Sequence, residues 1–324
     1  MIIKSFSSHR LPKLALNILL ALACSLGSAQ AVISNRQARD AAATILQAAP
    51  ADRYNRAVEV AQSITKNTNP ADAAANSAKI VSYLPSKAQR LFAGRVGVGI
   101  ALNFPNQLPS ITLKLISLNN NLRNNASLVV YQMAAAGGFD QAQQIAAALS
   151  LVMHRNERIG DQIEPITISL LSAISNRVGF SPLERANELA FVSANLSVSV
   201  IGGSKKLSSS QDRQLRLIAL TFSNYIKTLV KNNPKSASLV YNAVGNFANT
   251  LKQAVRSSVS SSTLNHILVQ TSIILQRAIP TEAASVQKAV QDIMDNHPNQ
   301  IDTGNVIDRE TPYVDSNNHQ IILR

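Results

Sequence analysis

The chain has 324 residues, a formal net charge of +13 and 46% hydrophobic residues, while aromatic residues make up only 4% and Trp is absent. This length gives one or two domains with enough chain to bury a core, and the apolar content excludes a wholly disordered protein. The scarcity of aromatic rings argues against a surface that stacks sugars or nucleic-acid bases.

Residues 1–31 have the three parts of a secretory signal peptide. Lys4, Arg10 and Lys13 form a positive region without acidic residues, and a mainly apolar run follows from Leu14 to Leu26. Ala29-Gln30-Ala31 then places small residues at the two positions that a signal peptidase reads, which predicts cleavage before Val32. The apolar run is shorter than the roughly 20 residues that a bilayer requires. We therefore expect an exported protein, periplasmic or secreted, with no transmembrane segment after cleavage.

Cys24 offers a second processing route. Ala21-Leu22-Ala23-Cys24 resembles a bacterial lipobox, in which the Cys is lipidated and becomes the first residue, although Leu stands one position later than expected. Lipid anchoring at Cys24 is thus the alternative to cleavage at Ala31. No other Cys occurs in the chain, which excludes disulfide bonds, thiol catalysis and Cys-ligated metal from the mature protein.

From residue 32 to residue 296, apolar residues recur at helical spacing behind recognisable start signals. Capping boxes, in which a Ser and a Gln or Glu three residues later satisfy each other's backbone N–H groups, are predicted at three positions: Ser34, Ser86 and Ser181. Asp52 and Thr281 are expected to cap further helices. Three capping residues directly precede a Pro that opens a helix: Asn69, Ser181 and Asn233.

The clearest apolar stripes lie in the second half of the chain. One begins at Leu239 and ends at Ala254, and another helix is predicted from about Gln211 to Val230, with later helices over Thr263–Ala278 and Glu282–Met294. The predicted buried side of the Gln211–Val230 helix consists of Leu215, Ile218, Phe222, Ile226 and Leu229.

The run from Val96 to Ile100 is the one ambiguous segment, because β-branched residues and glycines alternate there. We interpret it as helix, with Gly97 and Gly99 allowing a neighbouring helix to approach closely. Strand signals are otherwise nearly absent from 32–296, which makes the predicted fold class all-α.

The helices could be arranged in two ways. Val60, Val98, Tyr131 and Ile168 each begin a comparable sequence of helix end, turn and second helix, with separations of 38, 33 and 37 residues. These separations are typical of helix hairpins, but no consensus is shared and the tetratricopeptide pattern is missing. The sequence fits an irregular α-solenoid of helix hairpins or a compact helical bundle.

The predicted organisation is a signal peptide at 1–31, a helical domain at 32–296 and a flexible C-terminal tail at 297–324. Gly202 and Gly203 begin a polar segment, which gives a candidate internal boundary at 201–210. The segment 196–260 is strongly basic, with Asp212 as its one acidic residue. We take six of its residues as candidates for binding an anionic partner: Lys205, Lys206, Arg213, Arg216, Lys227 and Lys231. The alternative is that these charges only keep a helix face solvated.

The one dense cluster of titratable groups is His154–Glu164, which contains His154, Glu157, Asp161 and Glu164. It could supply a base and a carboxylate, but Arg155 and Arg158 would pair with its acids, and no second His is near. His266 is interpreted as a surface or half-buried residue of its helix. No P-loop, dinucleotide, zinc-protease or nucleophile-elbow motif occurs. We therefore assign no catalytic, cofactor-binding or metal-binding residues and expect no cofactor.

The favoured hypothesis is an exported, non-enzymatic helical scaffold that binds a macromolecular partner through helix surfaces. The first alternative is electrostatic binding of an anionic envelope polymer or membrane surface through residues 196–260. The third hypothesis is an enzyme that uses the His154–Glu164 region. Nucleotides are not expected partners, because nucleotide-binding motifs are missing. Nucleic acid is not expected either, because an exported protein leaves the compartment that holds the genomic DNA.

Overall fold

The computed structural model describes residues 32–136, 139–153, 160–202, 206–231, 233–254, 259 and 261–294. Throughout these residues the regular structure is helical and no strand occurs, which confirms the predicted all-α class. The tail at 297–324 and the signal region at 1–31 lie outside the described residues.

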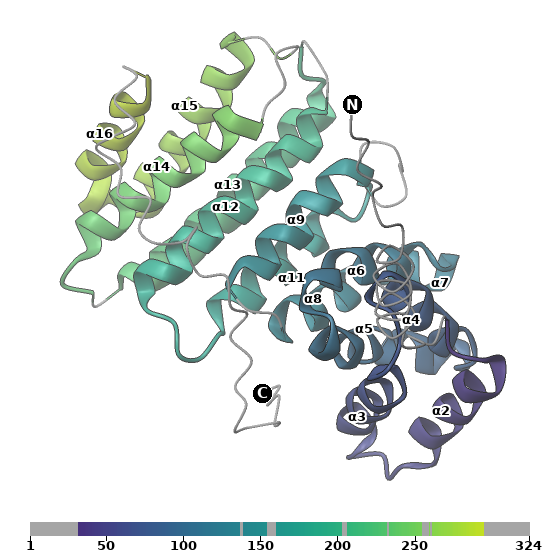
Figure 1. The fold of residues 1–324 in the computed structure, drawn as a ribbon. Coiled ribbons are helices and arrows are strands. Elements are labelled where there is room, and N and C mark those ends of the chain that lie inside the picture. Colours follow the sequence, from purple (N-terminus) through teal and green to yellow (C-terminus); the bar gives the residue numbers. More distant parts are fainter. Residues whose placement is uncertain are drawn as a thin grey trace, which may run out of the picture.

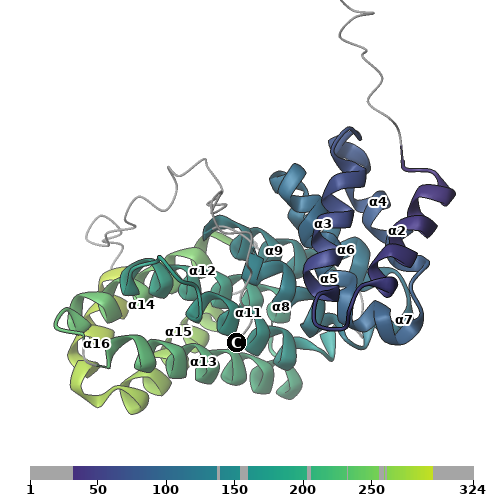
Figure 2. The same ribbon diagram turned by 90° about the horizontal axis from the view of Figure 1, so that it is seen from below.

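The helices form two rows (Figure 1 and Figure 2). In each row, every helix packs against the next one, and the chain passes repeatedly from one row to the other. The first row consists of α2 (Asn35–Gln47), α4 (Ala73–Ser82), α6 (Leu108–Ser117), α9 (Phe139–Met153), α12 (Pro182–Ile201), α14 (Ser236–Ala254) and α16 (Ala283–Met294). The second row consists of α3 (Arg53–Thr65), α5 (Ser86–Asn103), α8 (Ala126–Ala136), α11 (Ile163–Ser175), α13 (Ser209–Val230) and α15 (Ser261–Ala278).

Short helical segments connect some of these helices. They are α7 (Asn120–Arg123) and the 3-10 turns η1 (Pro70–Asp72), η2 (Pro105–Gln107) and η3 (Pro280–Glu282). Because α2 and α16 lie at opposite ends of the assembly in both views, the arrangement is an open array and not a closed bundle. It corresponds to the α-solenoid alternative that the sequence left open.

The four positions that suggested a helix-hairpin period lie in four different helices of this array. Val60 lies in α3, Val98 in α5, Tyr131 in α8 and Ile168 in α11, which are four successive helices of the second row. The candidate boundary at 201–210 falls between α12 and α13, and these two helices pack directly against each other.

Helix capping agrees with the sequence at some positions and differs at others. The capping boxes at Ser34 and Ser181 are both present, and Asn69 and Asn233 accept hydrogen bonds from backbone N–H groups two residues on. A further capping box at Ser208 and Gln211, which was not predicted, starts α13.

Three predicted caps were wrong. Ser86 is already inside α5, because the backbone N–H of Gln89 bonds to the carbonyl of Pro85, and the side chain of Gln89 donates to Leu84 O. Asp52 stands before α3 in a helical conformation, and its side chain makes no capping bond; the extended conformation of an N-cap residue is missing there. Thr281 lies within η3, whose own cap position is Ile279.

Helix α5 is packed tightly between α3 and α8, as the interpretation of its glycines predicted. A Cβ atom on Gly99 would lie 2.2 Å from the carbonyl oxygen of Val58 in α3. One on Gly94 would lie 2.4 Å from Oε1 of Gln132 in α8, and one on Gly97 would lie 2.5 Å from Sδ of Met133. The ambiguous run from Val96 to Ile100 is thus helical, and glycines stand where the neighbouring helices come closest.

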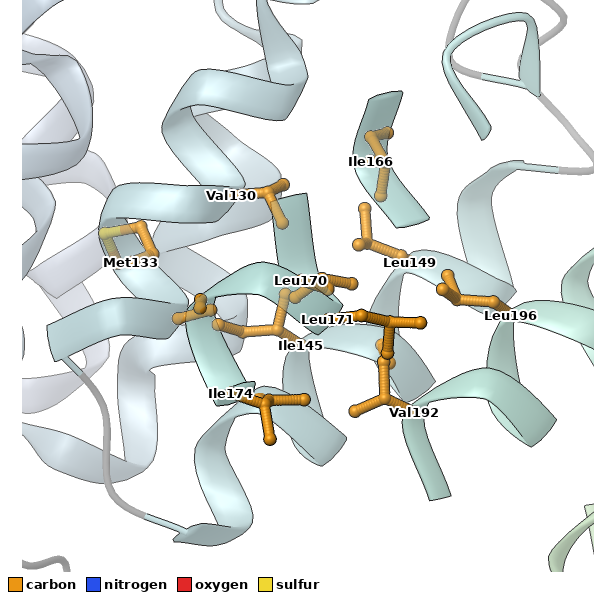
Figure 3. Close-up of a cluster of buried hydrophobic side chains, with 14 of the residues drawn as sticks. Val130, Met133, Ile145, Leu149, Ile166, Leu170, Leu171, Ile174, Val192 and Leu196 are labelled. Atoms are coloured by element: carbon orange, nitrogen blue, oxygen red, sulfur yellow. The ribbon is translucent and has the colours of Figure 1, made fainter. Parts of the chain in front are cut away.

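One continuous hydrophobic core runs between the two rows. Figure 3 shows its middle part, where α8, α9, α11 and α12 meet. Each of these buried side chains contributes roughly 1.5–3 kcal/mol by leaving water. The labelled residues are Val130, Met133, Ile145, Leu149, Ile166, Leu170, Leu171, Ile174, Val192 and Leu196.

A buried ion pair ties α8, α11 and α12 together. Nη1 of Arg177, which follows α11, donates to both carboxylate oxygens of Glu188 in α12 at 2.7 and 2.8 Å. Nη2 of Arg177 donates to the carbonyl oxygen of Ala134 in α8 at 2.7 Å. The guanidinium thus has a charged partner and a carbonyl acceptor, as a buried cation requires.

Candidate functional site

The basic residues predicted from the sequence are largely brought to one helix. Arg213, Arg216 and Lys227 are exposed residues of α13, and Lys231 is exposed directly after its last turn. Lys206 is exposed in the segment before α13, and Lys205 lies outside the described residues.

Six exposed positions recur along α13 at intervals of three and four residues, so they lie on one side of the helix. At the rise of an α-helix they extend over roughly 27 Å. We call this set the α13 ridge; it consists of Arg213, Arg216, Leu220, Asn224, Lys227 and Lys231.

The orientation of the ridge follows from the apolar stripe on the other side of the helix. All five predicted stripe residues are buried, which confirms that part of the sequence interpretation. With this side held against the core, the ridge faces solvent. The buried stripe is Leu215, Ile218, Phe222, Ile226 and Leu229.

The basic segment 196–260 does not form a single surface. Lys252, in α14, points to the other side of the array, where its Nζ donates to the carbonyl oxygen of Ile293 in α16 at 3.1 Å. Lys235 is exposed just before α14, and Arg256 lies outside the described residues. The cations that share a helix face are therefore those of the α13 ridge.

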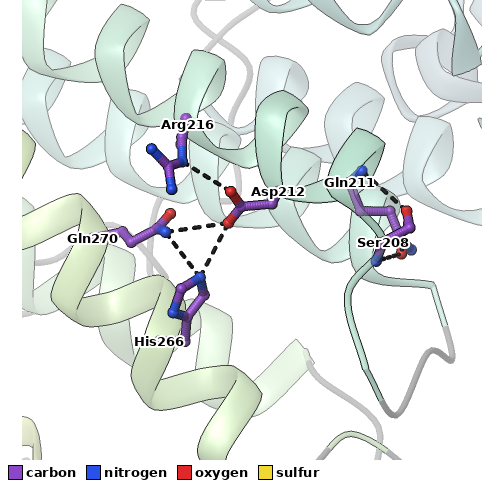
Figure 4. A network of polar contacts seen from close by, with 6 residues as sticks. All are labelled: Ser208, Gln211, Asp212, Arg216, His266 and Gln270. Atoms are coloured by element: carbon purple, nitrogen blue, oxygen red, sulfur yellow. Dashed lines mark hydrogen bonds and ion pairs between the residues drawn. The ribbon is translucent and has the colours of Figure 1, made fainter.

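Asp212 is the one acidic residue between Glu188 and Glu282 in the sequence, and its charge is shared by several partners (Figure 4). Its carboxylate lies 2.9 Å from Nε of Arg216 and 3.0 Å from Nε2 of His266, and it accepts a hydrogen bond from Nε2 of Gln270 at 3.1 Å. The hydrogen bond with His266 is the main cause that lowers the pKa of Asp212. Since His266 and Gln270 belong to α15, this network fixes α13 to its neighbour.

The other ridge cations carry no such neutralisation. In the described part of the chain, Arg213, Lys227 and Lys231 have no acidic side chain within ion-pair distance. Their charges are available to an external anion.

Exposed apolar side chains occur on α13 and on the two helices packed against it. Leu220 of the α13 ridge is 52% exposed, and Val269 and Ile273 of α15 are 44% and 43% exposed. Ile168 of α11, the neighbour of α13 on its other side, is 45% exposed. Single exposed apolar residues are ordinary, but these four lie on three successive helices of the second row. Leu220 thus offers an apolar contact beside the cations of its own helix.

The cluster predicted at 154–164 is only partly visible. His154 and Glu157 lie outside the described residues, while Asp161 and Glu164 are exposed at the start of α11. Where residues are described, no group of three or more His, Cys, Asp or Glu side chains is arranged to hold a metal ion. His266 is a half-exposed surface residue that contacts Asp212.

Sequence reasoning missed two features that the sequence does signal. Leu220 falls between Arg216 and Lys227 on the polar side of its helix, which a helical projection of 209–231 would have displayed. Arg95 is the one charged residue in the otherwise apolar and Gly-rich run from Leu91 to Ala101, and it is buried in the structure.

No family model, no curated protein and no solved structure matches this chain. Among the residues that the structure describes, none of the helices combines the length and the apolar character that crossing a bilayer requires.

Proposed function

We propose that this protein is an exported, non-enzymatic helical scaffold that binds an acidic protein partner along the α13 ridge. The observation that carries the proposal is the side-by-side exposure of cations and Leu220 on one helix face. Electrostatic complementarity speeds encounter and selects partners, while buried apolar contacts contribute affinity. A partner that presents carboxylates and apolar side chains on one face would match both the cations and Leu220 of the α13 ridge.

The apolar residues of α13 and α15 favour a protein over a purely polyanionic polymer. A polysaccharide or polyphosphate would be held by Arg213, Lys227 and Lys231 but would gain little from Leu220, Val269 or Ile273. Binding of an anionic polymer or membrane surface remains the alternative function, and it is distinguished by experiment below.

Export forms part of the proposal and rests mainly on the sequence of 1–31. Support comes from the residues after the expected cleavage site. Ile33, the second residue of the predicted mature chain, is 1% exposed, and its backbone N–H donates to Oδ1 of Asn76 at 3.0 Å. The second residue of the predicted mature chain is thus already part of the folded body. Expression in a bacterial host with mass analysis of the processed protein should give a chain that begins at Val32; an intact chain retained in the cytoplasm would overturn this part.

The binding proposal is tested with two synthetic probes of equal charge. One is an amphipathic helical peptide with Glu residues on one face and Leu residues on the other. The other is a poly-Glu peptide without apolar residues. We expect fluorescence anisotropy to show tighter binding of the amphipathic peptide, with an affinity that falls as salt rises. Equal binding of both peptides, or binding only to heparin or to vesicles rich in phosphatidylglycerol, would contradict a protein partner.

A matched pair of variants assigns the binding to the α13 ridge. Arg213→Gln/Lys227→Gln/Lys231→Gln should weaken peptide binding by roughly tenfold at low salt and should flatten its salt dependence. The control removes three exposed cations from the other half of the array: Lys87→Gln/Arg90→Gln/Lys114→Gln. An equal loss in both variants would show that only net charge matters and would refute the assigned surface.

A further inference from the structure

Arg95 is a buried cation whose surroundings differ from those of the other arginines. It lies in α5, is only 2% exposed, and its Nε is shut off from solvent without a hydrogen-bond partner. Across the described residues it has no hydrogen bond from either terminal nitrogen and no carboxylate within ion-pair distance. An ionised group in this position ordinarily has a partner.

Comparison with other arginines shows how unusual this is. In the described part of the chain, Arg123, Arg177 and Arg185 also have a buried Nε without a partner. Each of them, however, uses a terminal nitrogen: Arg123 donates to Oδ1 of Asn120, Arg177 to Glu188, and Arg185 to the carbonyl oxygen of Ser175. Arg95 alone within this group makes no hydrogen bond at all.

The neighbours of Arg95 are aromatic. Its guanidinium carbon lies 5.5 Å from the ring centre of Tyr54 in α3, and the edge of Tyr54 is fixed against Phe92 with ring centres 5.4 Å apart. Burial lowers the pKa of Arg95, and the nearby Tyr54 and Tyr131 hydroxyls act in the opposite direction. The ring of Tyr54 stabilises the cation from one face but leaves the edge of the guanidinium, where its N–H groups point, without acceptors.

The positions of these residues in the array are as informative as their distances. Tyr54, Arg95 and Tyr131 come from α3, α5 and α8, three successive helices of the second row. Tyr54, whose ring lies over the guanidinium, is 36% exposed, and Tyr131 is half-buried. Gly94 and Gly99 place α5 in close contact with α8 and α3, so the helices around Arg95 are tightly packed. A small ion would therefore approach Arg95 from the side of the accessible Tyr54 ring.

We propose that Arg95, flanked by Tyr54 and Tyr131, forms a binding site for a carboxylate or phosphate group. A guanidinium presents paired N–H donors whose spacing matches the two oxygens of either group, and such bidentate pairs are the strongest hydrogen bonds of this kind. Tyrosine hydroxyls also donate to anionic oxygens, and Tyr54 lies directly against the guanidinium. This site lies in the opposite half of the array from the α13 ridge and does not depend on it.

The test measures anion binding to the full mature protein with inorganic phosphate and acetate as separate probes, each against sodium chloride at equal ionic strength. Isothermal titration calorimetry gives the affinity, and tyrosine fluorescence gives a second readout that no Trp emission masks, with Tyr54 and Tyr131 as two of the six tyrosines. We expect saturable binding of phosphate, acetate or both. Binding of phosphate alone would assign a phosphate-bearing ligand, and binding of acetate alone a carboxylate.

Variants separate a specific site from a general salt effect. Arg95→Met should weaken binding of the preferred anion by at least about tenfold, while Arg90→Gln, which removes an exposed cation from the same helix, should leave it unchanged. If Arg95→Met does not fold, Arg95→Lys serves as the test variant, because it keeps the positive charge but loses the paired N–H donors of the guanidinium. It should also bind the anion more weakly than the wild type. Equal responses of wild type, Arg95 variant and Arg90→Gln, or no saturable binding to wild type, would overturn the proposal.

Discussion

The α3–α5–α8 region and the α8–α11–α12 region each bury one arginine, and the two are held in different ways. Arg177 lies over the ring of Phe180 and donates to Glu188 and Ala134. Arg95 lies over the ring of Tyr54 and donates to nothing in the described structure. The comparison teaches that burial alone does not define the role of a cation: Arg177 has acceptors within the protein, whereas Arg95 has none among the residues that the structure describes.

The largest expected effect concerns the paired arginine. Arg177→Met should lower the free energy of unfolding by about 3–5 kcal/mol, because Glu188 would be left as a buried, uncompensated charge. The double variant Arg177→Met/Glu188→Leu should recover most of that loss. Urea denaturation followed by circular dichroism measures both free energies of unfolding. A double variant as unstable as the single one would contradict the claim that the single variant loses stability because Glu188 is left unpaired.

The next effect concerns the packing that holds Arg95 in place. Gly99→Ala should destabilise the protein by about 1–3 kcal/mol, since its Cβ would meet the backbone oxygen of Val58, which cannot move without α3. Gly97→Ala is the matched control, because the nearest atom is the flexible Sδ of Met133 and the gain in helix propensity offsets part of the strain. Equal thermal stability of the two variants would show that α3 and α5 are not packed as described.

The unpaired arginine should behave differently from Arg177 in stability. Without added anion, Arg95→Met should change the free energy of unfolding by less than about 1 kcal/mol, because the lost cation–π contact is offset by removal of an unpaired buried charge. The same urea experiment checks this. A loss as large as that of Arg177→Met would mean that Arg95 has a structural role like that of Arg177.

The smallest effect contrasts these buried groups with the partly exposed Asp212. Its pKa is lowered in the folded state, mainly by the hydrogen bond with His266. Its stabilising contribution is therefore present above its unfolded pKa of about 3.9 and is lost as the pH falls through the lower folded value. For an exposed pair we expect less than about 1 kcal/mol. Asp212→Asn should remove this part of the acid dependence in denaturation curves measured between pH 6 and pH 2 (roughly the range over which carboxylates titrate), and an unchanged dependence would refute it.

The sequence predicted those features that depend on one helix at a time. The stripe from Leu215 to Leu229 was identified correctly because helical spacing decides which side of α13 is buried, and the same spacing orients Arg213 and Lys227. Gly97 and Gly99 were interpreted correctly for a similar reason, since glycines on an apolar helix favour close packing of a neighbouring helix.

Features that depend on which helices become neighbours could not be predicted. The pairing of Arg177 with Glu188 needs the turn between α11 and α12, and the network of Asp212 needs α15 beside α13. The capping prediction at Asp52 failed because residue type alone does not fix the backbone conformation before a helix. The separation of Arg95 from every acidic side chain of the described residues emerges only when α3, α5 and α8 are placed together.

The most direct test of the proposed surface is protection of lysines from acetylation when the amphipathic acidic peptide binds. Mass spectrometry of the modified protein reports each lysine separately, with Lys87 and Lys114 as exposed references. The account predicts that the peptide protects Lys227 and Lys231 and leaves Lys87 and Lys114 as reactive as before. Equal protection of all four lysines, or protection of the reference pair alone, would contradict it.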